Sequence, residues 1–169
     1  MAGLLNRVLV QAFKHLPWLG EWWARRYPFL RAATVPWAPL RKPLHECRLA
    51  LVTTAGVHLT DQPPFDMADP EGDPTYRAFS ADTPRPRLTI THDYYDHTAA
   101  DRDLNVVLPI DRVRELVVEG IVGEMAPTCY SLMGHIDGRH VATLVSRTAP
   151  EVAGRLGADG AEAVLLAPA

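Results

Sequence analysis

The densest group of chemically capable side chains lies at residues 91–97, with the sequence THDYYDH. Histidine and aspartate transfer protons near neutral pH, and both bind divalent metals. The group follows a short predicted strand, on the carboxyl-end side where open α/β sheets bind their ligands. We therefore expect His92, His97, Asp93 and Asp96 to be catalytic residues.

A metal-dependent hydrolase is the alternative for this segment. It differs by one residue from THxHxDH, the zinc motif of metallo-β-lactamase-like hydrolases, with Tyr94 in place of the middle histidine. That fold needs further downstream ligands, and His135 and His140 lack the required contexts. It also needs more strands than this chain supplies, so no metal is expected. A purely structural alternative is that the aspartates cap loops and the histidines bond to backbone.

Three further residues are expected to bind substrate: His58, Gly56 and Tyr95. His58 follows the first predicted strand at the edge favoured for ligands. Cys129 would need nearby positive charge or a helix N-terminus to become a nucleophile, and the sequence shows neither, so we expect a buried, inert thiol. Two cysteines cannot form a disulfide framework, which favours a reducing cytoplasm.

The elements that would position these residues follow from short apolar runs and helix signals. Strands are predicted at residues 48–54, 88–91, 121–126 and 163–167, the last one buried, with an extended piece at 104–108. Helices are predicted at 109–119 and from 148 to 160. Thr148 and Glu151 match a capping box at the start of the second helix. The roughly 30 residues after the first strand lack periodicity and predict an ordered loop with a function.

Alternating strands and helices predict an α/β fold with a mostly parallel sheet and flanking helices, of flavodoxin- or Rossmann-like type but incomplete. The predicted domains are an amphipathic helical arm at residues 1–35 and the main domain at 36–169. Apolar residues of the arm recur at helical spacing, near basic and tryptophan residues. Packing of the arm against its own domain or a partner subunit is expected, rather than contact with a membrane surface.

Composition narrows the function further. The chain has 169 residues, 47% hydrophobic, with a formal charge of −3, which gives no reason to expect nucleic-acid binding. Neither GxGxxG nor GxxxxGK[ST] occurs, so no nucleotide cofactor is implied. No apolar run approaches the roughly 18 residues of a membrane-spanning helix.

An ordered set of motifs from about residue 36 to the end resembles the selenoprotein B family of glycine, sarcosine, betaine and D-proline reductases. The stretches that carry the resemblance cover roughly four-fifths of the chain. They are Pro36-Trp37 with Leu40 and Pro43, LALVTTAGVHL, QPPFDM, GDPTYR, THDYYDH, DLNVVLPIDRVREL, EGIVG, the MG of SLMGH, and APEVAGRLGADGAEAVLLAPA. Tyr94 and Cys129 occupy positions where relatives commonly have histidine.

The resemblance implies a subunit of a selenol- or thiol-dependent reductase that cleaves a C–N type bond of a small amine or amino-acid substrate. In the family, a strand like AVLLAP is followed at once by selenocysteine or cysteine. We therefore expect selenocysteine just beyond Ala169 and a sequence truncated at an in-frame UGA. The resemblance also implies a pyruvoyl group on a partner subunit, and partner reductase subunits or a homo-oligomer. A non-catalytic binding subunit remains the third hypothesis.

Overall fold

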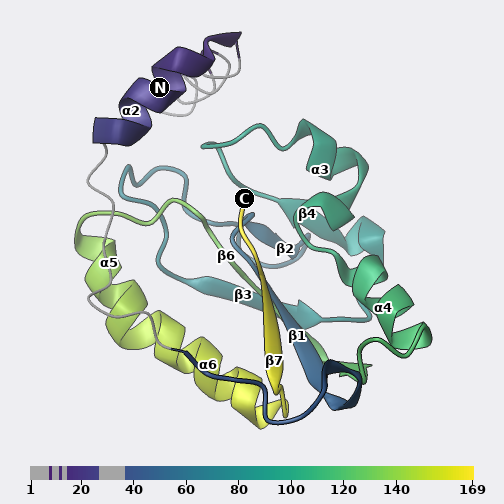
Figure 1. Cartoon of the computed structure of the whole chain (residues 1–169). Coiled ribbons are helices and arrows are strands. Elements are labelled where there is room, and N and C mark those ends of the chain that lie inside the picture. Colours follow the sequence, from purple (N-terminus) through teal and green to yellow (C-terminus); the bar gives the residue numbers. More distant parts are fainter. Residues whose placement is uncertain (1–7, 9–11, 13–14, 27–36) are drawn as a thin grey trace.

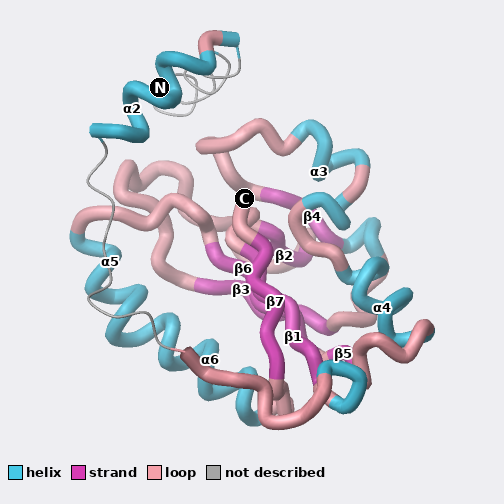
Figure 2. Tube along the Cα trace, in the orientation of Figure 1, coloured by secondary structure: helices cyan, strands magenta, loops and turns pink. Residues whose placement is uncertain are grey.

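A five-stranded, mostly parallel sheet forms the centre of the fold (Figures 1 and 2). The computed structural model describes residues 8, 12, 15–26 and 37–169. The strands of this sheet are β1 (Arg48–Thr53), β3 (Tyr76–Ser80), β5 (Glu124–Met125), β6 (Thr128–Leu132) and β7 (Ala163–Ala167). Only β3 runs antiparallel, along β6. The predicted α/β class with a mostly parallel sheet is confirmed.

Strand β1 is the central strand, because it is paired along both edges. Its Val52 pairs with Tyr130 of β6 and also with Leu166 of β7. The short strand β5 pairs with residues 48–49, where β7 also begins its pairing. Consequently β5 and β6 follow one edge of β1 in succession, and β7 follows the other edge.

The two faces of the sheet are covered by different helices. Side chains alternate along β1, so Leu51 packs in one cluster with Val113 of α4 (Ile110–Val118), whereas Val52 packs with Val152 of α6 (Ala149–Ala158). The connection from β1 to β6 thus includes α4 on one face, and the connection from β6 to β7 includes α6 on the other face. The two connections cross the sheet in opposite directions on opposite faces, so they have the same handedness.

The helical segment before β7 is longer than predicted. It comprises α5 (Arg139–Thr143), the π-helical turn η4 (Leu144–Thr148) and α6 without interruption. Thr148 is therefore helical and caps nothing; its hydroxyl donates to the carbonyl of Pro74 at 2.7 Å. Glu151 accepts a hydrogen bond from the Tyr76 hydroxyl instead of completing a capping box. The predicted capping box is wrong, whereas the helix end near Gly160 is confirmed.

The segment predicted as a long loop contains two strands. One is β3, and the other is β2 (Val57–Leu59), which pairs antiparallel with β4 (Leu88–Ile90) in a separate two-stranded sheet. The predicted strand at 88–91 therefore exists but lies outside the main sheet. Four short helices complete the described body: η1 (Leu44–Glu46), η2 (Arg85–Arg87), α3 (Thr98–Arg102) and η3 (Leu104–Val106). The extended piece predicted at 104–108 is wrong, since η3 occupies it.

Strand β7 was predicted as buried, and its position is confirmed but its burial is not. Its Val164, Leu165 and Leu166 are 41%, 40% and 68% exposed. The reason is that β7 pairs with β1 along one edge, and no strand among the described residues pairs with its other edge.

Helix α2 (Pro17–Arg26) is the longest described part of the arm and lies at the periphery, away from the sheet (Figure 1). The boundary predicted between residues 35 and 36 lies outside the described residues. None of the described helices has the length and apolar character required to cross a membrane.

Candidate functional site

The carboxyl ends of β1 and β6 form a topological switch point. These neighbouring strands continue into connections on opposite faces of the sheet, and open α/β sheets bind ligands in the crevice formed there. The two strand ends are held together by a bridge between Ala55 and Met133 and by the Gly56 amide, which donates to the carbonyl of Leu132 at 3.0 Å. The residues that follow these bonds lie at the favoured location.

Gly134, just after β6, is the point where three other segments converge. A Cβ atom at this glycine would lie 3.0 Å from the carbonyl oxygen of Ala169, 3.1 Å from that of Thr54, and 3.4 Å from Nε2 of His92. The amide of Ala169 also donates to the Thr54 hydroxyl at 3.0 Å. Ala169, two residues past β7, is thereby held next to Gly134, and the Thr54 carbonyl and His92 border the same space.

His92 is buried at this point, with 5% of its surface exposed. Its Nδ1 lies 3.1 Å from the Tyr94 amide and its Nε2 lies 3.3 Å from the Gly134 amide. A neutral imidazole has only one acceptor nitrogen. The Tyr94 and Gly134 amides both donate toward the ring, so two N–H donors compete for this one acceptor, and the Tyr94 amide makes the shorter contact.

The surroundings of His92 keep it neutral. Burial first, and then the charges of nearby His135 and His97, lower its pKa to about 4, against the opposing charge of Asp93. His92 is therefore a hydrogen-bond donor at neutral pH and is not a cation.

Aromatic rings enclose the imidazole. The Tyr95 ring meets His92 edge-on with centroids 4.7 Å apart, and its hydroxyl donates to the carbonyl of Ala55 at 3.2 Å. Burial raises the pKa of Tyr95 to about 12, so this hydroxyl keeps its proton. Tyr94 stacks on His135 with centroids 3.9 Å apart. The Tyr94 ring also meets His92 edge-on, with centroids 5.9 Å apart, so both tyrosine rings pack against the buried imidazole.

The other residues of the predicted catalytic group lie on the outer side of this cluster. His97 is partly exposed, its Nδ1 lies 2.8 Å from the Asp101 carboxylate, and its ring contacts Tyr95 edge-on. Asp96 accepts hydrogen bonds from the amide and hydroxyl of Thr98, which braces the start of α3. Asp93 acts on His92 through its charge.

Two of the predicted substrate-binding residues, His58 and Gly56, make contacts that hold the fold together. His58 is buried, with Nδ1 at 2.7 Å from the carbonyl of Leu59 and Nε2 at 2.8 Å from the Thr91 hydroxyl, so both ring nitrogens are used. Gly56 has a φ of +70°, and a Cβ there would lie 2.4 Å from the Thr91 carbonyl oxygen. Gly56 therefore permits the close approach of the segments that flank β2 and β4.

Sequence reasoning missed Gly134 and His135. Their signal was the Gly-His pair of SLMGH, which follows β6 directly, but residues 128–132 were not predicted as a strand. Cys129, which was placed after a strand, lies within β6 and is fully buried, and burial raises its pKa to about 12. Its predicted inertness agrees with this environment.

A group with metal-ligand spacing occurs elsewhere in the described part of the chain. Asp69, Glu71 and His140 each offer a ligand atom, all within 4.8 Å of one another. Arg139 forms ion pairs with both carboxylates, and His140 binds Asp69 at 3.0 Å. These carboxylates are thus already neutralised by protein groups, and within the described residues no comparable group forms at THDYYDH.

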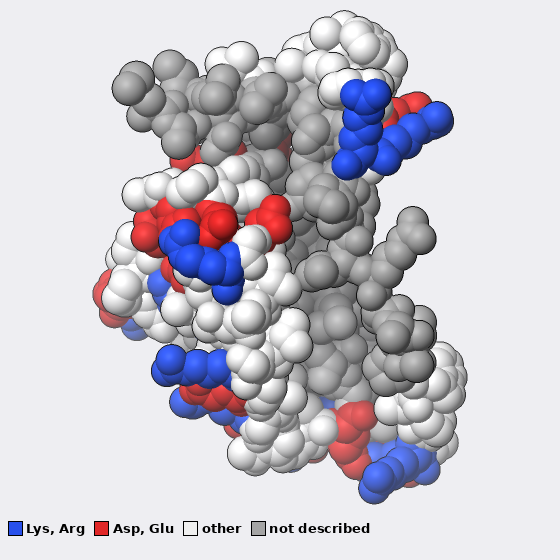
Figure 3. Space-filling view, turned by 90° about the vertical axis from the view of Figure 1, so that its left-hand side faces the viewer, with Lys and Arg blue, Asp and Glu red and all other residues white. Residues whose placement is uncertain are grey.

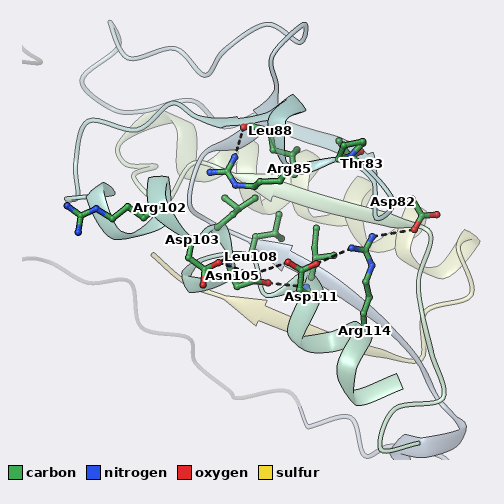
Figure 4. A pocket seen from close by; sticks show the side chains of 13 residues that line it. Asp82, Thr83, Arg85, Leu88, Arg102, Asp103, Asn105, Leu108, Asp111 and Arg114 are labelled. Atoms are coloured by element: carbon green, nitrogen blue, oxygen red, sulfur yellow. Dashed lines mark hydrogen bonds and ion pairs between the residues drawn. The ribbon is translucent and has the colours of Figure 1, made fainter. Parts of the chain in front are cut away.

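A cavity of about 220 Å³ lies between the β3–β4 connection and the start of α4 (Figure 4). Its charged side chains bind one another: Arg114 donates to Asp111 and to the carbonyl of Ala81, and Asn105 links Asp103 with Asp111. These bonds connect η3 and α4 to the end of β3. None of the residues predicted for the site lines this cavity.

Comparison with known proteins matches residues 8–169 to the family Glycine/sarcosine/betaine reductase selenoprotein B (GRDB). The D-proline reductase subunit gamma of Acetoanaerobium sticklandii is 35% identical over 77% of this chain and 52% of its own. The sarcosine reductase complex component B subunit beta of Peptoclostridium acidaminophilum is 30% identical over 68% of this chain and 27% of its own. The glycine reductase complex component B subunit gamma of Carboxydothermus hydrogenoformans is 28% identical over 87% of this chain and 34% of its own.

The chain thus spans about half the length, or less, of these curated relatives. No solved structure matches it. The match over nearly the whole chain, together with these relatives, shows that the chain belongs to the selenoprotein B family of glycine, sarcosine and betaine reductases.

Proposed function

We propose that this chain is part of a cytoplasmic reductase complex that cleaves a C–N bond of a small amine or amino acid, and that the switch-point cluster lines its reaction site. Family membership supports the reaction class, because the relatives are named as subunits of D-proline, glycine and sarcosine reductases. The location of the reaction site is supported by one observation: His92, Gly134 and the segment after β7 lie next to one another. Such a cleavage replaces the C–N bond of an amine by C–H and N–H bonds, taking up two electrons from a thiol-class donor and two protons.

The proposal places a selenocysteine, or a cysteine, directly after Ala169. The Ala169 carbonyl lies beside Gly134 and near Nε2 of His92, so a side chain at the next position would start at this cluster. A selenolate there supplies the nucleophile for the cleavage. The gene sequence tests this: an in-frame UGA or a cysteine codon is expected directly after codon 169, with a continuing frame and a further cysteine codon nearby. A UAA or UAG codon, or no continuing frame, would overturn it.

The residues of this chain then have distinct roles. His92, neutral and with Nε2 bordering the space beside Ala169, forms a hydrogen bond with the nucleophile or the substrate. It orients rather than delivers protons, because a neutral imidazole is a very weak acid. His97 is partly exposed and bound to Asp101, so we assign proton delivery to it. Tyr94 and Tyr95 restrict the access of water.

Two replacements of His92 distinguish the contributions of its two ring nitrogens. An asparagine side chain can accept the Tyr94 amide in place of Nδ1 but has no group at the Nε2 position, whereas glutamine reaches toward the Nε2 position with an N–H donor. We expect His92→Asn to fold and to lose turnover, His92→Gln to keep part of it, and His97→Ala to lower turnover while leaving His92 in place.

The assay uses the complete gene product with its partner subunits, a dithiol reductant, and D-proline, glycine, sarcosine and betaine as substrates. Circular dichroism of each variant confirms folding. Full turnover by a folded His92→Asn protein refutes the assigned role of His92. A parent complex that reduces none of the four substrates refutes the proposed function.

A further inference from the structure

Helix α2 has a face of large apolar side chains that the described structure leaves in solvent. Trp18 and Trp22 stand four residues apart, on one side of the helix, and are 65% and 50% exposed. Leu16 and Val8, upstream in the same arm, are 44% and 57% exposed. Exposed tryptophans in this number on so short a helix indicate a surface that binds something.

The body of the protein does not cover this face. Among the described residues, no hydrogen bond, ion pair or ring contact joins α2 to residues 37–169. Figure 1 shows the helix outside the layers formed by the sheet and its covering helices. The expectation that the arm packs on its own domain thus has no support in the described residues.

The charge of the arm is opposite to that of the body. Residues 1–35 contain five of the 17 lysines and arginines but only one of the 20 aspartates and glutamates, so they carry +4 and the rest of the chain −7. Arg25 and Arg26 lie in the last turn of α2, and the Arg26 guanidinium lies over the Trp22 ring at 4.6 Å. Basic residues beside tryptophan are typical of helices that lie in the headgroup region of an anionic membrane.

The acidic groups of the body offer the arm no comparable site. Most of its exposed carboxylates are paired with basic side chains of the body itself, and Figure 3 shows acidic side chains lying next to basic ones on that face. The pairs are Glu162–Lys42, Glu124–Arg48, Asp61–Arg87, Glu115–Arg112, Asp111–Arg114, Glu71–Arg139 and Glu151–Arg155. Seven carboxylates of the body are thus already paired with basic side chains, whereas a sheet of anionic lipid headgroups presents unpaired negative charge throughout.

We propose that α2 binds the surface of an anionic membrane, with Trp18 and Trp22 inserted between headgroups and Arg25 and Arg26 held at the phosphates. This departs from the prediction made from the sequence, which favoured packing against protein. The net negative charge of the body keeps the remainder of the chain away from the lipid. The inference is independent of the proposed reductase function.

The distribution of tryptophan supplies the reporter for the test. All four tryptophans lie within residues 1–37, three of them in α2. The purified full chain is titrated with vesicles of phosphatidylcholine containing 30% phosphatidylglycerol, and with vesicles of phosphatidylcholine alone. We expect a blue shift of tryptophan emission and co-flotation with the first vesicles, and a loss of both in 0.5 M NaCl, which screens headgroup attraction.

Matched variants locate the contact. Trp18→Ala with Trp22→Ala should weaken vesicle binding by about tenfold or more, as should Arg25→Glu with Arg26→Glu, because each pair removes a main source of affinity. Trp37→Ala is the control: Trp37 is 86% exposed but lies outside the helix, so binding should be unchanged. Circular dichroism verifies that each variant is folded.

Three outcomes overturn the proposal. One is the absence of binding to the anionic vesicles, and another is equal binding to vesicles without phosphatidylglycerol. The third is a dimer in analytical ultracentrifugation that the double tryptophan variant dissociates, without any vesicle binding, which would assign this face to a second copy. Reductase activity enters none of these readouts, so failure here leaves the proposed function standing.

Discussion

Replacement of His92 by asparagine should change how the stability of the protein depends on pH. In the folded protein burial lowers the pKa of His92 from 6.5 to about 4. In the unfolded chain the same group takes up a proton near pH 6.5. Between these two values the unfolded state binds a proton that the folded state does not. His92 therefore contributes stability that is fully present above pH 6.5 and is lost as the pH falls toward 4.

The magnitude follows from the size of the shift. A difference of about 2.5 pKa units corresponds to roughly 3 kcal/mol at full effect, since each unit is worth about 1.4 kcal/mol. Most of it, about 2 kcal/mol, is lost between pH 7.5 and pH 5.0. His92 is only 5% exposed, so solvent screening reduces this value little.

The measurement is urea unfolding at pH 7.5, 6.5 and 5.0, followed by far-ultraviolet circular dichroism. Tryptophan fluorescence is unsuitable because every tryptophan lies within residues 1–37. His92→Asn retains the acceptor for the Tyr94 amide and all other titrating groups. The parent protein should therefore lose about 2 kcal/mol more than the variant between pH 7.5 and 5.0. Equal losses in the two proteins would show that His92 is not held neutral by burial.

Two further predictions concern backbone strain and thiol burial. Gly56→Ala should destabilise the fold by about 1–3 kcal/mol, because φ is +70° and the added Cβ would meet the Thr91 carbonyl oxygen. Gly154→Ala is the control, because this glycine lies in α6 and its added Cβ would have no atom within 4 Å. It should instead stabilise the fold by about 0.5–1 kcal/mol. Urea unfolding measures both, and equal effects would contradict the argument. Cys129 and Cys47 are both buried, and the pKa of the Cys129 thiol is raised to about 12. Neither thiol should therefore react with Ellman's reagent at pH 8 until urea is added, and rapid reaction of the native protein would contradict this.

Elements with strong local signals were predictable from the sequence. The continuous apolar run at β1 is typical of a strand buried on both faces, and α4 combines an inward apolar face with a stop at Gly120, where φ is +71°. The strand β7 was also predictable, but its exposure was not. An apolar run indicates that a strand can be buried, whereas actual burial depends on neighbours that a local pattern does not reveal.

The strands that were missed have polar or mixed sequences. β6 (TCYSL) contains Ser131, which is fully buried, and β3 (YRAFS) buries mainly Phe79. Both owe their conformation to pairing with each other over about 50 residues of intervening chain. Pairing of this kind is a tertiary effect that weak local propensity does not predict. Because β6 was missed, Gly134 and His135 were never placed at the carboxyl edge of the sheet.

The same limit applies to the chemistry of His92. From its type alone a histidine has a pKa near 6.5 and is expected to exchange protons at neutral pH. Burial against Tyr95 instead keeps it neutral. The catalytic role expected of His92 stays a prediction; in the proposed function it binds the nucleophile or the substrate rather than delivering a proton. In the same proposal proton delivery belongs to His97, which is partly exposed and bound to Asp101.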